Sequence, residues 1–334
     1  MTPHGTILAP SPENIAHAAR ILREGGLAAF PTETVYGLGA NALDAEAVRR
    51  IYAAKGRPSS NPLIVHLASP NDIGVVARIE AGSDIEQKLR KLTQFWPGPL
   101  SIILPKRPEV PNETTAGLPS VAVRVPRHGV AQALIAAAGV PIAAPSANVS
   151  TYISPTTALH VAEGLGGKID CILDGGPCAV GVESTIISLV HPIPTVLRHG
   201  GVTIEALRAA LGDVHELEVN AGPTEPLLSP GLVRQHYAPR TPLVFLGDIP
   251  TESVPPKAAL VICGDSPPIE NHARYTEVVS LSPAGKLDDA ARELFAVLRR
   301  LDQAGLDLIV VAPCEPRGLG RAIMDRLTRA AAQG

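Results

Sequence analysis

The chain has 334 residues, of which 45% are hydrophobic and 18% are charged, so it can build a sizeable core and intrinsic disorder is excluded. Its 29 basic and 32 acidic residues give a net charge of −3, and no basic half or tail indicates nucleic-acid binding. This length is typical of one large domain or two modest ones.

The first two thirds of the chain alternate amphipathic segments with short apolar ones. Ser11 followed by Pro12 is a typical helix start, and Asp44 can cap the next helix, which must end near Gly56. Helices are expected at residues 12–24, 45–55, 84–96, 130–138 and 204–211. Strands are expected at 27–30, 62–68, 99–105, 121–126, 141–146, 171–176, 185–190 and 195–200. This alternation predicts an α/β domain with a twisted, mixed, open sheet and flanking helices.

A proline-rich segment without periodicity follows and is typical of a linker. Beyond it, a second set of apolar segments predicts a smaller, Rossmann-like α/β unit. Its strands are expected at 242–248, 258–265, 276–281 and 306–313, and its helices at 288–301 and 320–332. We therefore divide the chain into a domain over 1–219, a linker over 220–241 and a C-terminal domain over 242–334.

Several classes of protein are disfavoured. The longest uncharged stretch, 128–162, is interrupted by prolines and polar residues and does not fit a membrane span. The first residues carry no secretory signal pattern, so a cytoplasmic location without membrane association is expected. The four cysteines lie far apart without a CxxC pair, which predicts reduced, structural thiols.

Two glycine-rich segments match loose nucleotide-binding patterns, but neither fits in full. No strand with a suitably placed acidic residue follows Gly37 and Gly39, and Lys168 is not followed by serine or threonine. We therefore expect neither a dinucleotide loop nor a P-loop.

Polar residues gather at the ends of apolar strands, where open α/β sheets bind ligands. FPTETVYGLGANA places Thr34 in a glycine-terminated loop, and KGRPSSNPLIVH supplies Lys55, Arg57, Asn61 and His66. The two cations suit phosphate oxygens, although on their own they also fit a solvated helix end.

Arg124 lies inside an alternating strand, where a buried guanidinium needs an anionic partner. That partner is either a carboxylate of the chain, such as Glu183, or a carboxylate of the substrate, and the spacing leaves both open. Ser154 followed by Pro155 is expected to cap a helix. Further candidates beside strands are Ser146, Ser184 and Arg198.

Together these residues favour phosphate chemistry, because phosphoryl or nucleotidyl transfer needs charge neutralisation and positioning more than a protein nucleophile. A magnesium ion carried by the nucleotide would serve that chemistry. A metal site held by the protein is not expected, because the spacing of four histidines is unlike that of ligands: His128, His160, His199 and His236. They are interpreted as surface or internally satisfied residues.

Eight segments, in this order, resemble the YrdC-type threonylcarbamoyl-AMP synthases: FPTETVYGLGANA, KGRPSSNPLIVH, FWPGPLSIILP, VAVRVP, PSANVS, SPT, GVESTI and VLRHGG. The resemblance covers about residues 10–212. The following SPGLVRQHYAP segment and α/β tail resemble the two-domain form of the family, which implies a linker acting as a lid over the active site.

The resemblance implies a nucleotidyltransferase that makes L-threonylcarbamoyladenylate and pyrophosphate from L-threonine, bicarbonate or CO2, and ATP with Mg2+. Other proteins would transfer the threonylcarbamoyl group to the tRNA adenosine beside the anticodon, so direct tRNA binding is expected to be weak or absent. The implied threonine-binding residues are Thr34, His66, Arg124, Ala144 and Ser184. The implied ATP-binding residues are Arg57, Asn61, Ser120, Ser146, Ser154, Arg198 and Tyr237. Lys55 and Arg57 are expected to stabilise developing charge.

One position departs from the family pattern. Thr151 stands where a glycine is usual, in STYISPT, so the turn that leads to Ser154 is expected to differ.

Two other functions fit parts of the sequence. A noncatalytic module that binds double-stranded RNA is the first alternative, although a net charge of −3 and 3% aromatic residues disfavour it. A carbamoyl-transferring enzyme of hydrogenase maturation is the second, although the zinc-finger and acylphosphatase-like modules of such enzymes are not found in this sequence.

Overall fold

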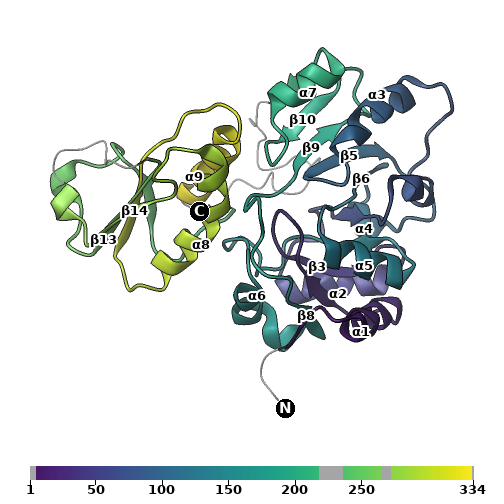
Figure 1. Cartoon of the computed structure of the whole chain (residues 1–334), viewed down its shortest axis with the longest axis horizontal. Helices are drawn as coiled ribbons and strands as arrows, with labels where there is room; N and C mark the ends of the chain where they lie inside the picture. The colour runs from purple at the N-terminus through teal and green to yellow at the C-terminus, as the bar shows by residue number, and fades with distance from the viewer. Residues whose placement is uncertain (1–4, 218–235, 265–271, 333–334) are drawn as a thin grey trace.

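The computed structural model describes residues 5–217, 236–264 and 272–332, which form two α/β lobes (Figure 1). The strands of the larger lobe are β1 (Thr6–Leu8), β2 (Ala28–Phe30), β3 (Gly37–Asn41), β4 (Ile64–His66), β5 (Leu100–Pro105), β6 (Ser120–Arg124), β7 (Ile142–Ala143), β8 (Cys171–Leu173), β9 (Thr185–Ser188), β10 (Thr195–Arg198) and β11 (His215–Glu216). Its helices are α1 (Pro12–Arg23), α2 (Ala45–Lys55), α3 (Asp84–Leu92), α4 (Asn112–Thr115), α5 (Gly129–Ala138), α6 (Ala158–Leu165) and α7 (Ile204–Leu211).

The smaller lobe contains β12 (Leu243–Phe245), β13 (Ala258–Ile262), β14 (Glu277–Ser280), β15 (Leu308–Val311), α8 (Leu287–Asp302) and α9 (Gly320–Ala331). Short 3-10 segments lie at Pro70–Val75, Thr93–Phe95, Gly166–Lys168, Thr251–Ser253 and His272–Arg274.

The larger sheet mixes parallel and antiparallel pairs in the order β1-β8-β2-β3-β7-β4-β6-β5-β9-β10-β11. Strands β4 and β6 run parallel, and their last residues, His66 and Arg124, are partners in the register. Because partners in register point to the same face of a sheet, these two side chains emerge together at the carboxyl ends of neighbouring strands.

Successive residues of a strand point to opposite faces of the sheet, so the apolar core of this lobe has one part on each face. Ala28 and Phe30 pack into an apolar cluster with α1 and α5, whereas Ala29 belongs to a cluster that includes residues of α2, α3, α6 and α7. Helices therefore cover both faces, as the sequence predicts.

The smaller lobe has a parallel sheet in the order β12-β15-β13-β14. Helices α8 and α9 lie on the side of this sheet that faces the larger lobe (Figure 1). Phe295 of α8 and Ile323 of α9 share an apolar cluster with Val35, Ile153 and Val182 of the larger lobe. Burial of this shared cluster holds the two lobes together.

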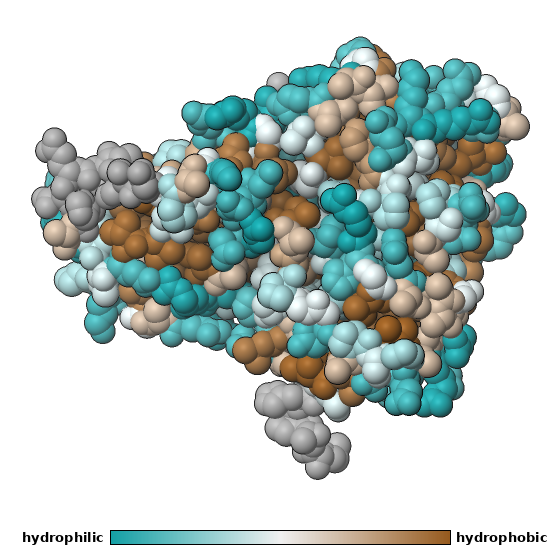
Figure 2. Space-filling model, in the orientation of Figure 1, coloured by the Kyte–Doolittle hydropathy of each residue, from teal (hydrophilic) through white to brown (hydrophobic). Residues whose placement is uncertain are grey.

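The surface mixes hydrophilic and apolar areas on both lobes (Figure 2). Exposed large apolar side chains such as Val75 and Leu159 are ordinary on globular proteins. No helix in the described ranges is long and apolar enough to cross a membrane. All four cysteines are free, in agreement with the prediction of reduced thiols.

The predicted helix signals are confirmed where a side chain caps the helix. The backbone N–H of Asn14 donates to the Ser11 hydroxyl over 3.2 Å, and Asp44 accepts from the backbone N–H of Glu46 over 2.9 Å. Gly56 ends α2 with a φ of +61°, a left-handed conformation that favours glycine. The helix predicted at 204–211 is α7, with the same bounds.

The loop that carries Thr34 ends at a glycine, as predicted, because residues from Gly37 form strand β3, paired antiparallel with β2. A Cβ at Gly39 would lie 2.8 Å from the Phe30 ring, so close packing explains this glycine. The prediction that Ser154 caps a helix is wrong. Helix α6 begins at Ala158 with Thr157 as its cap, because the hydroxyl of Ser154 instead donates to the buried carboxylate of Glu183.

The predicted linker, 220–241, lies outside the described residues except for 236–241. Its closing over the site, and the domain boundaries placed on either side of it, stay predictions.

Candidate active site

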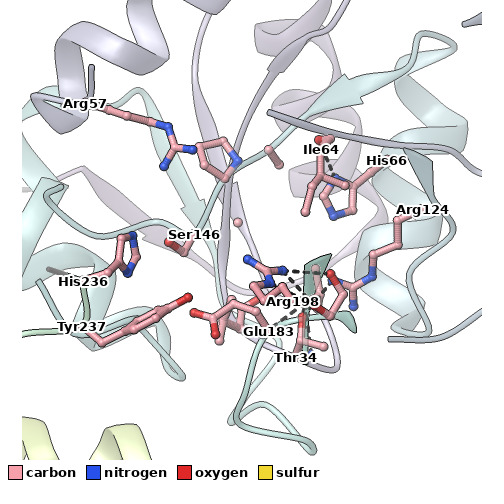
Figure 3. A pocket seen from close by; sticks show the side chains of 16 residues that line it. Thr34, Arg57, Ile64, His66, Arg124, Ser146, Glu183, Arg198, His236 and Tyr237 are labelled. Atoms are coloured by element: carbon pink, nitrogen blue, oxygen red, sulfur yellow. Dashed lines mark hydrogen bonds between the residues drawn. The ribbon is translucent and has the colours of Figure 1, made fainter. Parts of the chain in front are cut away.

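A cavity opens at the carboxyl ends of β2, β4 and β6. The side chains of His66 and Arg124 lie on one side of it, and those of His236 and Tyr237 lie on the opposite side (Figure 3). The lining residues are Thr32, Thr34, Val35, Gly37, Arg57, Ile64, His66, Arg124, Ala144, Pro145, Ser146, Glu183, Ser184, Arg198, His236 and Tyr237. Three arginines thus face one cavity, which suits an anionic ligand.

Arg124 is buried and held by several partners. Its Nη1 donates to the Thr34 hydroxyl over 2.9 Å, and its Nε donates to the Gly98 carbonyl over 3.2 Å. Its Nη2 lies 2.8 Å from Glu33 Oε2, although the N–H is not well aligned with that oxygen for a hydrogen bond. The carboxylate of the chain that pairs with Arg124 is therefore Glu33 and not Glu183, and Nη2 remains available as a donor.

His66 is buried beside Arg124. Burial and the neighbouring Arg124 charge lower the pKa of His66 to about 3, so its ring is neutral near pH 7. One ring nitrogen lies 3.2 Å from the Ile64 carbonyl, and the ring meets Phe30 edge-on. A neutral imidazole here can donate or accept a hydrogen bond without adding charge.

Arg57 lines the cavity just beyond the end of α2. Its Nη2 donates to the Pro62 carbonyl over 3.0 Å, and burial lowers its pKa to about 10, which leaves it charged at neutral pH. A buried guanidinium that donates to backbone carbonyls retains attraction for an anion.

Lys55 does not line the cavity. Its Nζ donates to the Ser146 and Asn148 carbonyls, each over 2.5 Å, and the side chain is buried. Burial and the charge of Arg57 hold the pKa of Lys55 well below its usual range. These contacts favour a role in fixing the segment that carries Ser146.

Hydrogen bonds join Arg198 to Ser184, which lies beside Ser101. Nη2 of Arg198 donates to the Ser184 carbonyl over 2.9 Å and to its hydroxyl over 3.2 Å. The Ser184 hydroxyl lies 2.8 Å from that of Ser101. A hydroxyl held in this way presents a defined hydrogen-bonding direction to a ligand.

Glu183 is a cavity residue that the sequence suggested only as a partner for Arg124. Its Oε1 accepts from the Ser154 hydroxyl over 2.5 Å, and its Oε2 accepts from Nε of Arg326 over 2.9 Å. Burial opposes its charge, but Arg326, Arg198 and the two hydrogen bonds hold the pKa of Glu183 below its usual value. It therefore brings a negative charge to the cavity wall.

His236 is a second lining residue that sequence reasoning missed, because it was interpreted as a surface or satisfied histidine. Its side chain is buried, and its ring lies 4.0 Å from that of Tyr237. Burial and the nearby Arg57 charge hold the pKa of His236 well below its usual range. Its nearness to Tyr237 in the sequence is the signal that could have identified it.

The structure brings together nine of the thirteen predicted site residues around one cavity: Thr34, Arg57, His66, Arg124, Ala144, Ser146, Ser184, Arg198 and Tyr237. The other four are Lys55, Asn61, Ser120 and Ser154, which do not line it. Asn61 is buried in the loop before β4, and Ser120 is the first residue of β6. The individual binding roles of all thirteen stay predictions.

Thr151 adopts a φ of +69°, the left-handed conformation that favours glycine. The turn keeps a glycine-like backbone, and the Thr151 carbonyl accepts from the Ala238 N–H over 2.9 Å. This contact ties the end of the linker to the segment before Ser154.

Two family models match this chain, and together they cover most of both lobes. A family model described as telomere recombination matches residues 20–200, and one described as the C-terminal domain of threonylcarbamoyl-AMP synthase matches residues 202–332.

Two curated relatives match along nearly the whole chain. A threonylcarbamoyl-AMP synthase of Pyrococcus abyssi is 43% identical over 319 residues, which cover 94% of this chain and 92% of that protein. One of Bacillus subtilis is 42% identical over 336 residues, covering 97% and 94%. The crystal structure of P. abyssi Sua5 complexed with L-threonine has a TM-score of 0.87 at 40% identity, covering 98% of this chain and 97% of that one.

Proposed function

The chain belongs to the threonylcarbamoyl-AMP synthase family, and we propose that it converts L-threonine, bicarbonate or CO2, and ATP into L-threonylcarbamoyladenylate and pyrophosphate. The product supplies the threonylcarbamoyl group for modification of the tRNA adenosine beside the anticodon. The observation that carries this proposal is the convergence of three buried arginines and several fixed hydroxyls on one cavity.

We assign the β4–β6 side of the cavity to threonine. Arg124 suits the amino acid carboxylate, and Thr34 and Ser184 offer hydroxyls for its polar groups. The neutral ring of His66 and the methyl group of Ala144 complete this subsite. The P. abyssi protein, which shares this fold, was crystallised with L-threonine.

We assign the opposite side to ATP. Arg57 and Arg198 suit phosphate oxygens, and Ser146 can donate to them. Tyr237 contributes a buried ring at the edge of the cavity, where it would shield the mixed anhydride from water. Asn61, Ser120 and Ser154 do not line the cavity, and their part in ATP binding stays a prediction.

The reaction needs positioning more than covalent catalysis. The threonine amine captures CO2 and loses a proton, giving a carbamate. A carbamate oxygen then attacks the α-phosphorus of ATP in line, and pyrophosphate leaves. Arg57 stabilises charge that develops on the phosphate oxygens, whereas Lys55 acts by holding the Ser146 segment in place.

Mg2+ enters with ATP as part of the substrate. In the described part of the chain, no group of three or more histidine, cysteine, aspartate or glutamate side chains could hold a metal. Glu183 is the carboxylate that lines the cavity, and both its oxygens already accept hydrogen bonds from the protein. This donor set fits an ion held mainly by the phosphates.

The adenylate passes to proteins that transfer the threonylcarbamoyl group to tRNA, so this chain needs little contact with tRNA. The relatives named as synthases support an enzyme rather than a noncatalytic RNA-binding module.

The test is pyrophosphate release from ATP by the purified protein, with L-threonine and bicarbonate together and with each omitted. Release that requires both, with the adenylate detected by mass spectrometry, supports the proposal. Release that ignores threonine, or no release while RNA binds in a salt-dependent manner, contradicts it.

A further inference from the structure

Arg326, in the last helix of the chain, reaches the wall of the cavity in the larger lobe. Its side chain is fully buried, and its Nε donates to Glu183 Oε2 over 2.9 Å. Glu183 itself lines the cavity between Arg198 and Tyr237 (Figure 3). The C-terminal domain therefore touches the site through a charged group as well as through apolar packing.

The carboxylate of Glu183 joins the two lobes at this point. Its other oxygen accepts from the Ser154 hydroxyl over 2.5 Å, and Ser154 is fully buried. Because a carboxylate can only accept hydrogen bonds, it fixes Ser154 as a donor and so sets the direction of the remaining lone pairs of that hydroxyl. A neutral Glu183 acid could donate instead and would release this constraint.

Arg326 also contacts a second lining residue. Its guanidinium lies 5.3 Å from the centre of the Tyr237 ring, which stacks on Phe295 of α8 at 5.5 Å. Nη1 of Arg326 donates to Asp325 over 2.6 Å, and this hydrogen bond helps to fix the orientation of the guanidinium. Tyr237 has a φ of +63°, which makes its backbone costly to hold without such support.

The charge on Glu183 depends on this arginine. Burial alone would favour the neutral acid, and Arg326 is the leading group that opposes burial. The polar groups that interact with the carboxylate are Arg326 of α9, Arg198 of β10, Ser154 and Tyr237. Removal of Arg326 leaves Arg198 as the remaining strong positive neighbour.

We propose that Arg326 is a positioning residue of the adenylate-forming site, which holds the Glu183 carboxylate in place, thereby fixes Ser154, and supports the ring of Tyr237. The C-terminal domain thus completes the active site across the domain interface. This inference rests on the proposed function, and it concerns the ATP side of the cavity more than the threonine side.

The test compares Arg326→Gln and Arg326→Lys with Arg321→Gln, a control on the same helix whose side chain is one-third exposed and pairs with Glu205 over 3.6 Å. We expect Arg326→Gln to lower kcat at least about 10-fold and to raise the KM for ATP, while the KM for L-threonine changes less than about 3-fold. The acid limb of its pH profile should move to higher pH, and Arg326→Lys should return that limb towards its position in the wild type. Wild-type kinetics and an unshifted limb in Arg326→Gln would overturn the inference.

A second variant separates positioning from folding. Glu183→Gln combined with Arg326→Gln removes both charges of this ion pair, so neither partner is left as a charge without the other. We expect its unfolding midpoint to be near that of the wild type, with kcat still at least about 10-fold lower. Wild-type activity in this double variant would show that Arg326 only joins the lobes.

Calorimetric titration with ATP distinguishes failure of this inference from failure of the proposed function. If the wild type releases no pyrophosphate, the proposed function fails, but weaker ATP binding by Arg326→Gln than by Arg321→Gln still supports the positioning role. Equal ATP affinities would then overturn it.

Discussion

Nη2 of Arg124 lies 2.8 Å from the Glu33 carboxylate, and each of these side chains is 4% exposed. The two residues are close, yet the N–H is not directed at the oxygen, so the pair neutralises the buried guanidinium without using all its donors. An incoming carboxylate can therefore bind Arg124 beside Glu33 rather than having to displace it.

Arg124→Gln should weaken L-threonine selectively. Loss of a charge-assisted hydrogen bond costs about 1.5–3 kcal/mol, which raises the KM for threonine about 10-fold to 100-fold, while the KM for ATP changes little. Steady-state kinetics with each substrate varied measure the split. Arg127→Gln, an exposed arginine three residues on, is the control. An equal rise in both KM values would contradict the assignment of Arg124 to threonine.

Arg57→Gln should reduce turnover without unfolding the protein. Its guanidinium lines the cavity and donates to the Asn61 and Pro62 carbonyls, so we expect its charge to act on the substrate phosphates. Loss of one preorganised donor to a developing charge costs about 100-fold in kcat or more.

The measurement is kcat for pyrophosphate release alongside the thermal unfolding midpoint, with the exposed Arg49→Gln on α2 as control. A kcat within about 3-fold of that of the wild type, with the substitution verified, would remove Arg57 from the catalytic assignment.

Lys55→Met should lower both stability and activity. Its ammonium supplies donors to two carbonyls, and methionine leaves both without this partner in a buried place. Each unsatisfied carbonyl costs about 1–3 kcal/mol, partly offset because the buried charge is also removed. Urea unfolding and kcat, measured on the same preparation, test this role. Unchanged unfolding with lost activity would point to direct catalysis by Lys55 instead.

The sequence predicted those features that depend on neighbouring residues. The caps at Ser11 and Asp44 act within three residues, and helix α7 has the predicted bounds, because these signals are read from short segments. The family resemblance located most of the cavity, since the motif residues lie beside strands whose order the fold fixes.

Contacts between distant segments could not be predicted in this way. Glu183 and Arg326 are 143 positions apart and lie in different lobes, so no periodicity links them. The SPTT segment offers two possible caps, and the choice of Thr157 over Ser154 depends on that same carboxylate. The mistaken cap at Ser154 thus comes from a buried anion whose partners lie elsewhere in the chain.

His66 should make the folded protein less stable as the pH falls. Burial and Arg124 lower its pKa to about 3 in the folded state, whereas an unfolded chain binds a proton near pH 6.5. The unfolded state therefore binds more protons between these values, so the stability from this residue is complete above about pH 6.5 and is lost as the pH falls towards 3.

Between pH 6.0 and 4.5 this residue removes about 2 kcal/mol from the unfolding free energy. His66→Gln should lose that much less than the wild type over the same interval, as measured by urea unfolding at both pH values. The control is His17→Gln, which replaces an exposed histidine of α1. The unfolding free energy of this variant should change with pH as that of the wild type does.

Burial also lowers the pKa of His236, so some acid sensitivity persists in His66→Gln. The quantity that tests the prediction is therefore the difference between the wild type and His66→Gln. Parallel pH dependences for the wild type and His66→Gln would mean that His66 takes up its proton in the folded and unfolded states alike, which would contradict the lowered pKa of this buried ring.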